Sequence, residues 1–188
     1  MKIALVVCGS RGDVQPMLAL ALGLRKAGHE SSLCAPPENE VWASSLGCPF
    51  LALGASIRGN PSLAGGGLGA MSRFIRQELG TQIQQLPDMV RGHDLLLATG
   101  LVFGVPSVAE HLDIPYRYVA FSPAPSLGTT RDPAAMKLAG WLMAKLTNAT
   151  LRGVVNRKRR ELGLRPVDDV LSSWIGSRPI AATDAALT

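Results

Sequence analysis

The chain has 188 residues, enough for one domain with a substantial buried core. Hydrophobic residues make up 47% and charged residues 18%, a balance that is typical of a folded globular protein and excludes a disordered chain. No apolar run reaches the ~18 residues of a membrane span, and the first apolar run is too short for a secretory signal.

The three cysteines and the net charge add little about function. Cys8, Cys34 and Cys48 have neither the spacing of a disulfide framework nor that of a metal site, so we expect free thiols in a reducing, cytoplasmic compartment. The formal net charge of +5 is modest, and much of it lies in one run, Arg152–Arg160. This run predicts a basic amphipathic helix, which either carries a solvated face or touches an anionic membrane surface.

Strands and helices alternate along the first third of the chain. Lys2–Cys8 (KIALVVC) is a near-continuous apolar run, typical of a parallel strand buried on both faces. A helix is predicted over Val14–Ala27, since apolar residues recur at helical spacing, Pro16 fits a first turn and Gly28 supplies a stop. The next predicted elements are a strand over Ser31–Ala35, a helix over Pro37–Leu46 and a strand over Pro49–Leu53.

The pattern is interrupted once and then resumes. Gly54–Gly69 contains many glycines and no apolar period, so it predicts a long loop. The later predictions are a helix over Ala70–Val90, a strand over Asp94–Thr99, a helix over Phe103–Leu112, a strand over Tyr116–Phe121, helices over Ala134–Leu146 and Ala149–Leu162, a further short helix, and a last strand over Arg178–Ala182. This alternation predicts an α/β fold, a doubly wound, Rossmann-like parallel sheet with helices on both faces.

Ligands of such folds bind in the loops at the carboxyl ends of the strands, and the first of these loops is Gly9–Asp13. It matches neither nucleotide fingerprint: the dinucleotide motif requires glycine where Arg11 stands, and the P-loop requires a lysine that is absent. Two roles remain open for Asp13, a helix cap and a general base for a substrate hydroxyl. If Pro16 is the first helical residue, Gln15 caps the helix and Asp13 is free for other work.

Two motifs carry a family resemblance that covers essentially the whole chain. Gly9–Pro16 (GSRGDVQP), with the helix that follows to His29, resembles the start of GT-B fold glycosyltransferases that act on natural products and sterols. Ala109–Pro115 (AEHLDIP), followed by a strand and Ser122-Pro123, fits the same group. The resemblance implies that residues 1–188 form the N-terminal, acceptor-binding half of a GT-B fold, and that a nucleotide-sugar-binding domain is absent from this chain.

The resemblance also implies a reaction and a site. Members invert the anomeric centre of a nucleoside-diphosphate sugar while they move a hexose to a hydroxyl, here of a hydrophobic natural product or lipid. Many members have a histidine at the position of Asp13, whereas the antibiotic-glycosylating subgroup has an aspartate there, as this chain does. Asp13 is therefore the implied general base. The implied substrate-binding residues are Ser10, Arg11, Gly12, Phe74, Ser122 and Pro123. The nucleotide sugar is a co-substrate, so no bound cofactor is expected. Neither a metal nor a nucleic-acid partner is expected.

Three readings remain open at this point. The first is half of an enzyme, nearly inactive alone, and the second is a non-catalytic acceptor-binding or regulatory subunit that pairs with a separate donor-binding chain. A doubly wound binding protein that has lost catalysis is the third reading, and the presence of Asp13 argues mildly against it.

Overall fold

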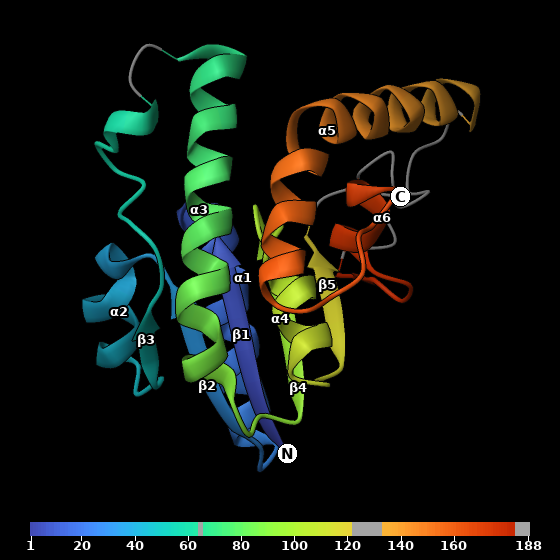
Figure 1. Ribbon diagram of the computed structural model, residues 1–188. Helices are drawn as coiled ribbons and strands as arrows, with labels where there is room; N and C mark the ends of the chain where they lie inside the picture. The colour runs from blue at the N-terminus through green and yellow to red at the C-terminus, as the bar shows by residue number, and fades with distance from the viewer. Residues whose placement is uncertain (64–65, 122–132, 183–188) are drawn as a thin grey trace.

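The computed structural model describes residues 1–63, 66–121 and 133–182, which form a parallel sheet flanked by helices (Figure 1). The described strands are β1 (Lys2–Cys8), β2 (Glu30–Ala35), β3 (Phe50–Ala52), β4 (Leu95–Gly100), β5 (Tyr116–Ala120) and β6 (Ile180–Ala181). They lie side by side in the order β3-β2-β1-β4-β5-β6, and every pair is parallel. This order places a topological switch point between β1 and β4. The predicted fold class is confirmed.

Helices cover both faces of the sheet. They are α1 (Arg11–Lys26), α2 (Glu40–Ser45), α3 (Gly67–Val90), α4 (Val105–His111), α5 (Pro133–Glu161) and α6 (Val170–Ile175). Because successive side chains of a strand point to opposite faces, β1 contributes to two core clusters: Leu5 packs with α1, and Val6 belongs to the cluster of α3, α4 and α5. Figure 1 shows α3, α4 and α5 in front of the sheet and α1 behind it.

Helix α1 begins earlier than the sequence predicted. It starts at Arg11 rather than Val14, Ser10 is its N-cap with an extended backbone, and Pro16 lies inside it. The prediction that Gln15 caps the helix is therefore wrong. The physical reason is the first turn itself, in which the Asp13 carboxylate accepts a hydrogen bond from the N-cap amide and so supports an earlier start.

The segment predicted as a loop over Gly54–Gly69 contains helical residues. A 3₁₀ turn spans Pro61–Leu63, and α3 starts at Gly67 instead of Ala70. The Glu38 carboxylate accepts a hydrogen bond from the Ile57 amide at 2.9 Å, and the Asn60 side chain donates to the Ser56 carbonyl at 3.0 Å. Polar side chains thus satisfy backbone groups that no strand or helix pairs.

The two helices predicted over Ala134–Leu146 and Ala149–Leu162 are joined in one bent helix, α5 (Figure 1). The Thr150 hydroxyl donates to the Leu146 carbonyl at 2.8 Å and lies 3.2 Å from the Thr147 carbonyl. Hydrogen bonds of this kind to the preceding turn bend helices. The interval between the two predicted helices, residues 147–148, therefore lies within one helix, at its bend.

Candidate functional site

The loop between β1 and α1 holds the Asp13 side chain in one position. Its Oδ2 atom accepts a hydrogen bond from the Ser10 backbone amide at 2.8 Å and lies 3.2 Å from the Ser10 hydroxyl. Among the described residues, Oδ1 has no hydrogen-bond partner. One carboxylate oxygen therefore fixes the group to the helix end, and the other is available to a ligand.

Two glycines leave the space that this arrangement needs. A Cβ atom at Gly9 would collide with the Asp13 carboxylate, and one at Gly100 would collide with the Cys8 carbonyl. Gly100 also has a positive φ of 79°, which favours glycine. The end of β4 can therefore approach the end of β1, where the Leu101 amide donates to the Cys8 carbonyl at 2.7 Å.

A largely apolar pocket of about 360 Å³ lies at these strand ends and is bordered by Asp13. Its apolar lining comes from Ile57, Leu63, Met71, Phe74, Leu101 and Trp174. The pocket sits at the switch point between β1 and β4, where doubly wound folds bind their ligands. Its volume is within the range of small-molecule sites. The arrangement can hold an apolar molecule with a hydroxyl next to a carboxylate.

One wall of this apolar pocket comes from the far end of the chain. The Trp174 indole, on α6, donates to the Gly100 carbonyl at 3.1 Å and lies against Phe103 and Tyr118, with ring centroids 4.6 and 5.1 Å away. The Tyr116 hydroxyl donates to the Trp174 carbonyl at 2.6 Å. Sequence reasoning missed Trp174 because nothing local indicates that α6 returns to the end of β4.

Tyr118 is the second lining residue that the sequence analysis missed. Burial raises the pKa of its hydroxyl, and the negative charge of Asp13 raises it further. The group is therefore a neutral hydrogen-bond donor and acceptor at ordinary pH. A signal was available, since strand alternation gives Tyr116, Tyr118 and Ala120 a common face.

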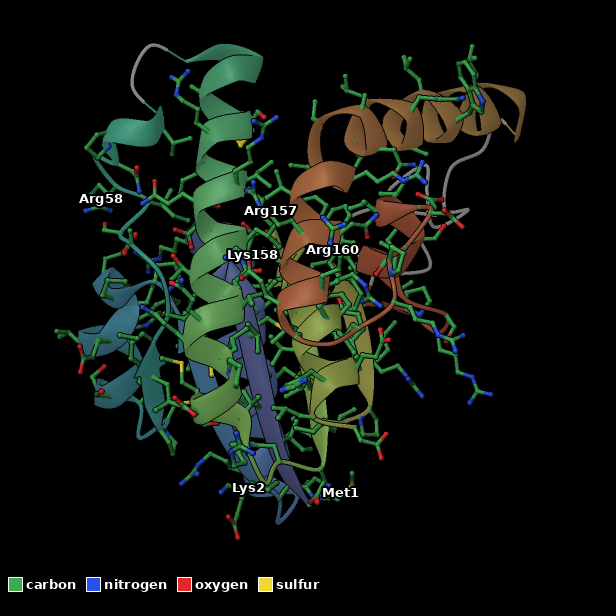
Figure 2. All side chains as sticks on the ribbon, viewed as in Figure 1. Met1, Lys2, Arg58, Arg157, Lys158 and Arg160 are labelled. Atoms are coloured by element: carbon green, nitrogen blue, oxygen red, sulfur yellow. The ribbon has the colours of Figure 1, made fainter. Side chains whose placement is uncertain are left out.

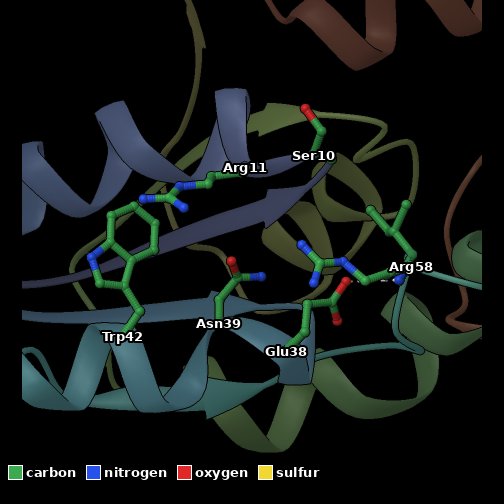
Figure 3. A pocket seen from close by; sticks show the side chains of 8 residues that line it. Ser10, Arg11, Glu38, Asn39, Trp42 and Arg58 are labelled. Atoms are coloured by element: carbon green, nitrogen blue, oxygen red, sulfur yellow. Dashed lines mark hydrogen bonds between the residues drawn. The ribbon is translucent and has the colours of Figure 1, made fainter.

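A second, more polar pocket of about 640 Å³ is also lined by residues of this loop (Figure 3). It is lined by Gly9, Ser10, Arg11, Glu38, Asn39, Trp42, Ile57 and Arg58. The Arg11 guanidinium lies 4.9 Å from the centre of the Trp42 ring. The two pockets adjoin and share part of the loop, but only the apolar pocket borders Asp13.

The predicted site residues are distributed unevenly over these pockets. Ser10 borders both, Phe74 lines the apolar pocket from α3, Arg11 lines the polar pocket, and Gly12 lines neither. Phe74 is only 2% exposed, so it is also part of the core. Ser122 and Pro123 lie outside the described residues. The roles predicted for all six stay predictions.

A buried carboxylate lies beneath the site. Glu78 of α3 is 2% exposed and lies 3.9 Å from the Cys8 thiol and 3.5 Å from the Ala55 amide. Burial raises the pKa of the Glu78 carboxyl. Burial also raises the pKa of Cys8, and the charge of Glu78 raises it further, so Cys8 is a neutral thiol. All three cysteines are free, as the sequence predicted, and all three are buried.

The basic run Arg152–Arg160 is only partly a solvated face (Figure 2). Arg159 is 3% exposed and donates to both Glu110 carboxylate oxygens, at 3.1 and 2.8 Å, and to the Arg165 carbonyl at 2.7 Å. Arg152 and Lys158 pair with Asp168 and Glu161. Arg157 and Arg160 are exposed on α5. Contact with a membrane surface stays a prediction.

The described part of the chain contains neither a metal-binding cluster nor a membrane-spanning helix. No cluster of three or more histidine, cysteine, aspartate or glutamate side chains within it is arranged to hold a metal ion. No helix within it is long and apolar enough to cross a membrane.

Sequence comparison finds glycosyltransferases that match the whole length of this chain. Glycosyltransferase GtfE from Amycolatopsis orientalis is 34% identical over 206 residues, which cover 100% of this chain and 50% of the relative. Vancomycin aglycone glucosyltransferase from the same organism is 32% identical over 203 residues, with 100% and 50% covered. The chain thus spans about half the length of these relatives.

A solved structure shows the same fold. SsfS6, a glycosyltransferase from Streptomyces sp. SF2575, matches with a TM-score of 0.63 at 20% sequence identity, over 99% of this chain and 51% of that protein. SsfS6 has also been solved with thymidine diphosphate, and that structure covers 100% of this chain with a TM-score of 0.61. The profile of the glycosyltransferase family 28 N-terminal domain matches residues 3–125. The chain therefore belongs to the family of glycosyltransferase family 28 N-terminal domains.

Proposed function

We propose that this chain is the acceptor-binding half of an inverting glycosyltransferase in which Asp13 is the general base. The observation that carries the proposal is the place of the Asp13 carboxylate, held by Ser10 at the border of an apolar pocket at the sheet switch point. Membership of the glycosyltransferase family 28 N-terminal domain supports the reaction class.

In the proposed reaction the acceptor hydroxyl gives its proton to the Asp13 carboxylate. The hydroxyl oxygen forms a bond to the anomeric carbon of the sugar, and the bond from that carbon to the nucleoside diphosphate breaks. Attack opposite the leaving group inverts the anomeric carbon. The available oxygen, Oδ1, suits the role of proton acceptor because Oδ2 is already engaged by Ser10.

The proposed acceptor is a hydrophobic, hydroxylated natural product or lipid. Its apolar part is proposed to contact Phe74, Met71 and Trp174, which line the pocket beside Asp13. We propose that a second domain binds the nucleotide sugar, without a metal. The half-length match to the relatives and the thymidine diphosphate bound to SsfS6 support this division.

The test joins this chain to the donor-binding half of vancomycin aglycone glucosyltransferase and measures sugar transfer by mass spectrometry with a panel of hydrophobic acceptors. Asp13→Asn is expected to lower kcat by ~10²-fold or more, the usual contribution of a general base. Asp88→Asn, an exposed carboxylate of α3, is the matched control and is expected to change nothing. Equal turnover of the Asp13→Asn hybrid and its parent would contradict the proposal.

Acceptor binding by the 188-residue chain supplies a second readout that does not depend on the hybrid. Calorimetric titration with the acceptors found in the screen is expected to give similar affinities for the parent and Asp13→Asn, because the apolar walls remain. Loss of binding together with turnover would assign Asp13 to acceptor binding instead of proton transfer.

A further inference from the structure

The polar pocket beside the Gly9–Asp13 loop contains two guanidinium groups that no carboxylate neutralises by a salt bridge in the described part of the chain. Arg11 reaches into it from the first turn of α1, and Arg58 reaches into it from the loop after β3 (Figure 3). Neither side chain donates a hydrogen bond to another described residue. From these two groups and the pocket that they line we propose a binding site for an oxyanion, a carboxylate, phosphate or sulfate carried by a small molecule.

A cation–π contact places the Arg11 guanidinium over the Trp42 ring without using its hydrogen-bond donors. The guanidinium lies 4.9 Å from the centre of the indole ring. The guanidinium carries five N–H donors, and none of them is used in a hydrogen bond to another described residue. The N–H donors of a planar guanidinium match the geometry of carboxylate and phosphate oxygens.

Arg58 is presented by a short turn whose backbone is tied down on both sides. The Ile57 amide donates to Glu38 at 2.9 Å, and the Asn60 side chain donates to the Ser56 carbonyl at 3.0 Å. The Ser56 hydroxyl also donates to the Arg58 carbonyl at 3.3 Å. The turn therefore holds the base of the Arg58 side chain at the border of the pocket.

The pocket also contains one negative charge, that of Glu38. Its carboxylate is 2.9 Å from the Ile57 amide, so part of its hydrogen-bonding capacity is used by the protein. With Arg11 and Arg58 the lining carries two positive charges and one negative charge, and its net charge favours an anion. Asn39 and Trp42 complete the lining with an amide and an aromatic ring, which suit a ligand that joins the oxyanion to a ring.

The proposal goes beyond the proposed sugar transfer and does not rest on it. Trp42 of α2 lines the polar pocket, whereas Asp13 borders only the apolar pocket of the two. Binding of the oxyanion is therefore measured without a donor sugar, a donor domain or any turnover.

In the experiment, the 188-residue chain is titrated with phenyl phosphate, benzoate and uncharged benzyl alcohol. Binding is measured by calorimetry and by the NMR signal of the Trp42 indole. Trp42→Phe assigns that signal. At least one of the two anions is expected to bind saturably, more weakly as salt is added, and to shift the indole signal. Phenyl phosphate alone would identify a phosphate-type site, and benzoate alone a carboxylate-type site. Binding of neither anion, or equal binding of benzyl alcohol, overturns the proposal.

Variants then locate the site. Arg11→Gln and Arg58→Gln are each expected to weaken anion binding by about tenfold, the usual effect of one charge-assisted hydrogen bond. Glu38→Gln keeps an oxygen for the Ile57 amide and removes a negative charge, so it is expected to strengthen binding. Arg91→Gln, at an exposed arginine outside both pockets, is the control. Anion binding that resists both pocket variants, or that falls equally in the control, contradicts the assignment.

Discussion

The Asp13 carboxylate and the Ser10 backbone amide are joined by a hydrogen bond of 2.8 Å at the start of α1. The bond satisfies an amide that the helix itself leaves unpaired, and it orients the carboxylate beside the apolar pocket. Capping and proton transfer are therefore compatible roles for Asp13, because they use different oxygens of the same group.

The capping role predicts a measurable stability difference between two variants. Asp13→Ala removes the acceptor for the Ser10 amide and a negative charge near the helix N-terminus, so it should lower the free energy of unfolding by about 1 kcal/mol. Asp13→Asn keeps an acceptor oxygen and should lose less. Urea denaturation of the two variants measures the difference. Equal stability of the parent and Asp13→Ala would show that the hydrogen bond contributes nothing to folding.

The close approach of Gly9 to Asp13 predicts a loss of activity together with the loss of the Asp13–Ser10 hydrogen bond. Gly9→Ala places a Cβ against the Asp13 carboxylate and should turn that flexible side chain away from Ser10. The hybrid enzyme described above should then lose at least about tenfold in kcat, and the free energy of unfolding should fall by about 1 kcal/mol, as for loss of the Asp13–Ser10 bond. Gly12→Ala is the matched control, since its Cβ would meet nothing closer than the Ser10 hydroxyl oxygen at 3.5 Å. Similar kinetics for both variants would contradict the prediction.

Local sequence signals predicted the parallel sheet and the position of the Gly9–Asp13 loop. The other pocket-lining residues are placed by contacts between distant parts of the chain. The apolar run Lys2–Cys8 correctly indicates a buried strand, and the loop predicted after it borders the apolar pocket. Trp174 reaches the apolar pocket through a return of the chain across β5, with a sequence separation of 74 residues from its partner Gly100. No local periodicity encodes such a contact, and the same is true of Arg58 in the polar pocket.

The hydrogen bond of Trp174 predicts a graded effect on the apolar pocket. Trp174→Phe keeps an aromatic wall and loses the bond to the Gly100 carbonyl, so it should cost about 1 kcal/mol of stability. Trp174→Ala also removes the contacts with Phe103 and Tyr118 and should cost about 3 kcal/mol. Urea denaturation measures both losses. Acceptor titration should show weaker binding in the same order, and unchanged acceptor affinity in Trp174→Ala would exclude a role in binding.

The burial of Glu78 predicts that stability depends on pH. Burial raises the pKa of its carboxyl from the ordinary value of 4.5, so the folded state holds the proton more tightly than the unfolded state. The stabilisation is present below pH 4.5 and is lost as the pH rises through the higher folded-state pKa. Glu78→Gln, which does not ionise, should therefore become more stable relative to the parent as the pH rises from 4 to 7. Denaturation at several pH values tests this, and the same change at exposed Glu40 should show no such trend.

The burial of Arg159 predicts that this residue of the basic run Arg152–Arg160 stabilises the fold. Arg159→Gln leaves Glu110, Ser107 and the Arg165 carbonyl without their donor, and should lower the free energy of unfolding by about 2 kcal/mol. Because Glu110 is half exposed, water can replace part of that interaction, and the loss stays below that of a fully buried pair. Arg159→Lys should recover little, since an ammonium cannot reproduce the two-oxygen contact with Glu110. Arg160→Gln, one residue further along α5 and exposed, should change stability by less than about 0.5 kcal/mol. Urea denaturation of the three variants decides the matter: equal losses at Arg159 and Arg160 would mean that the run acts only through its overall charge.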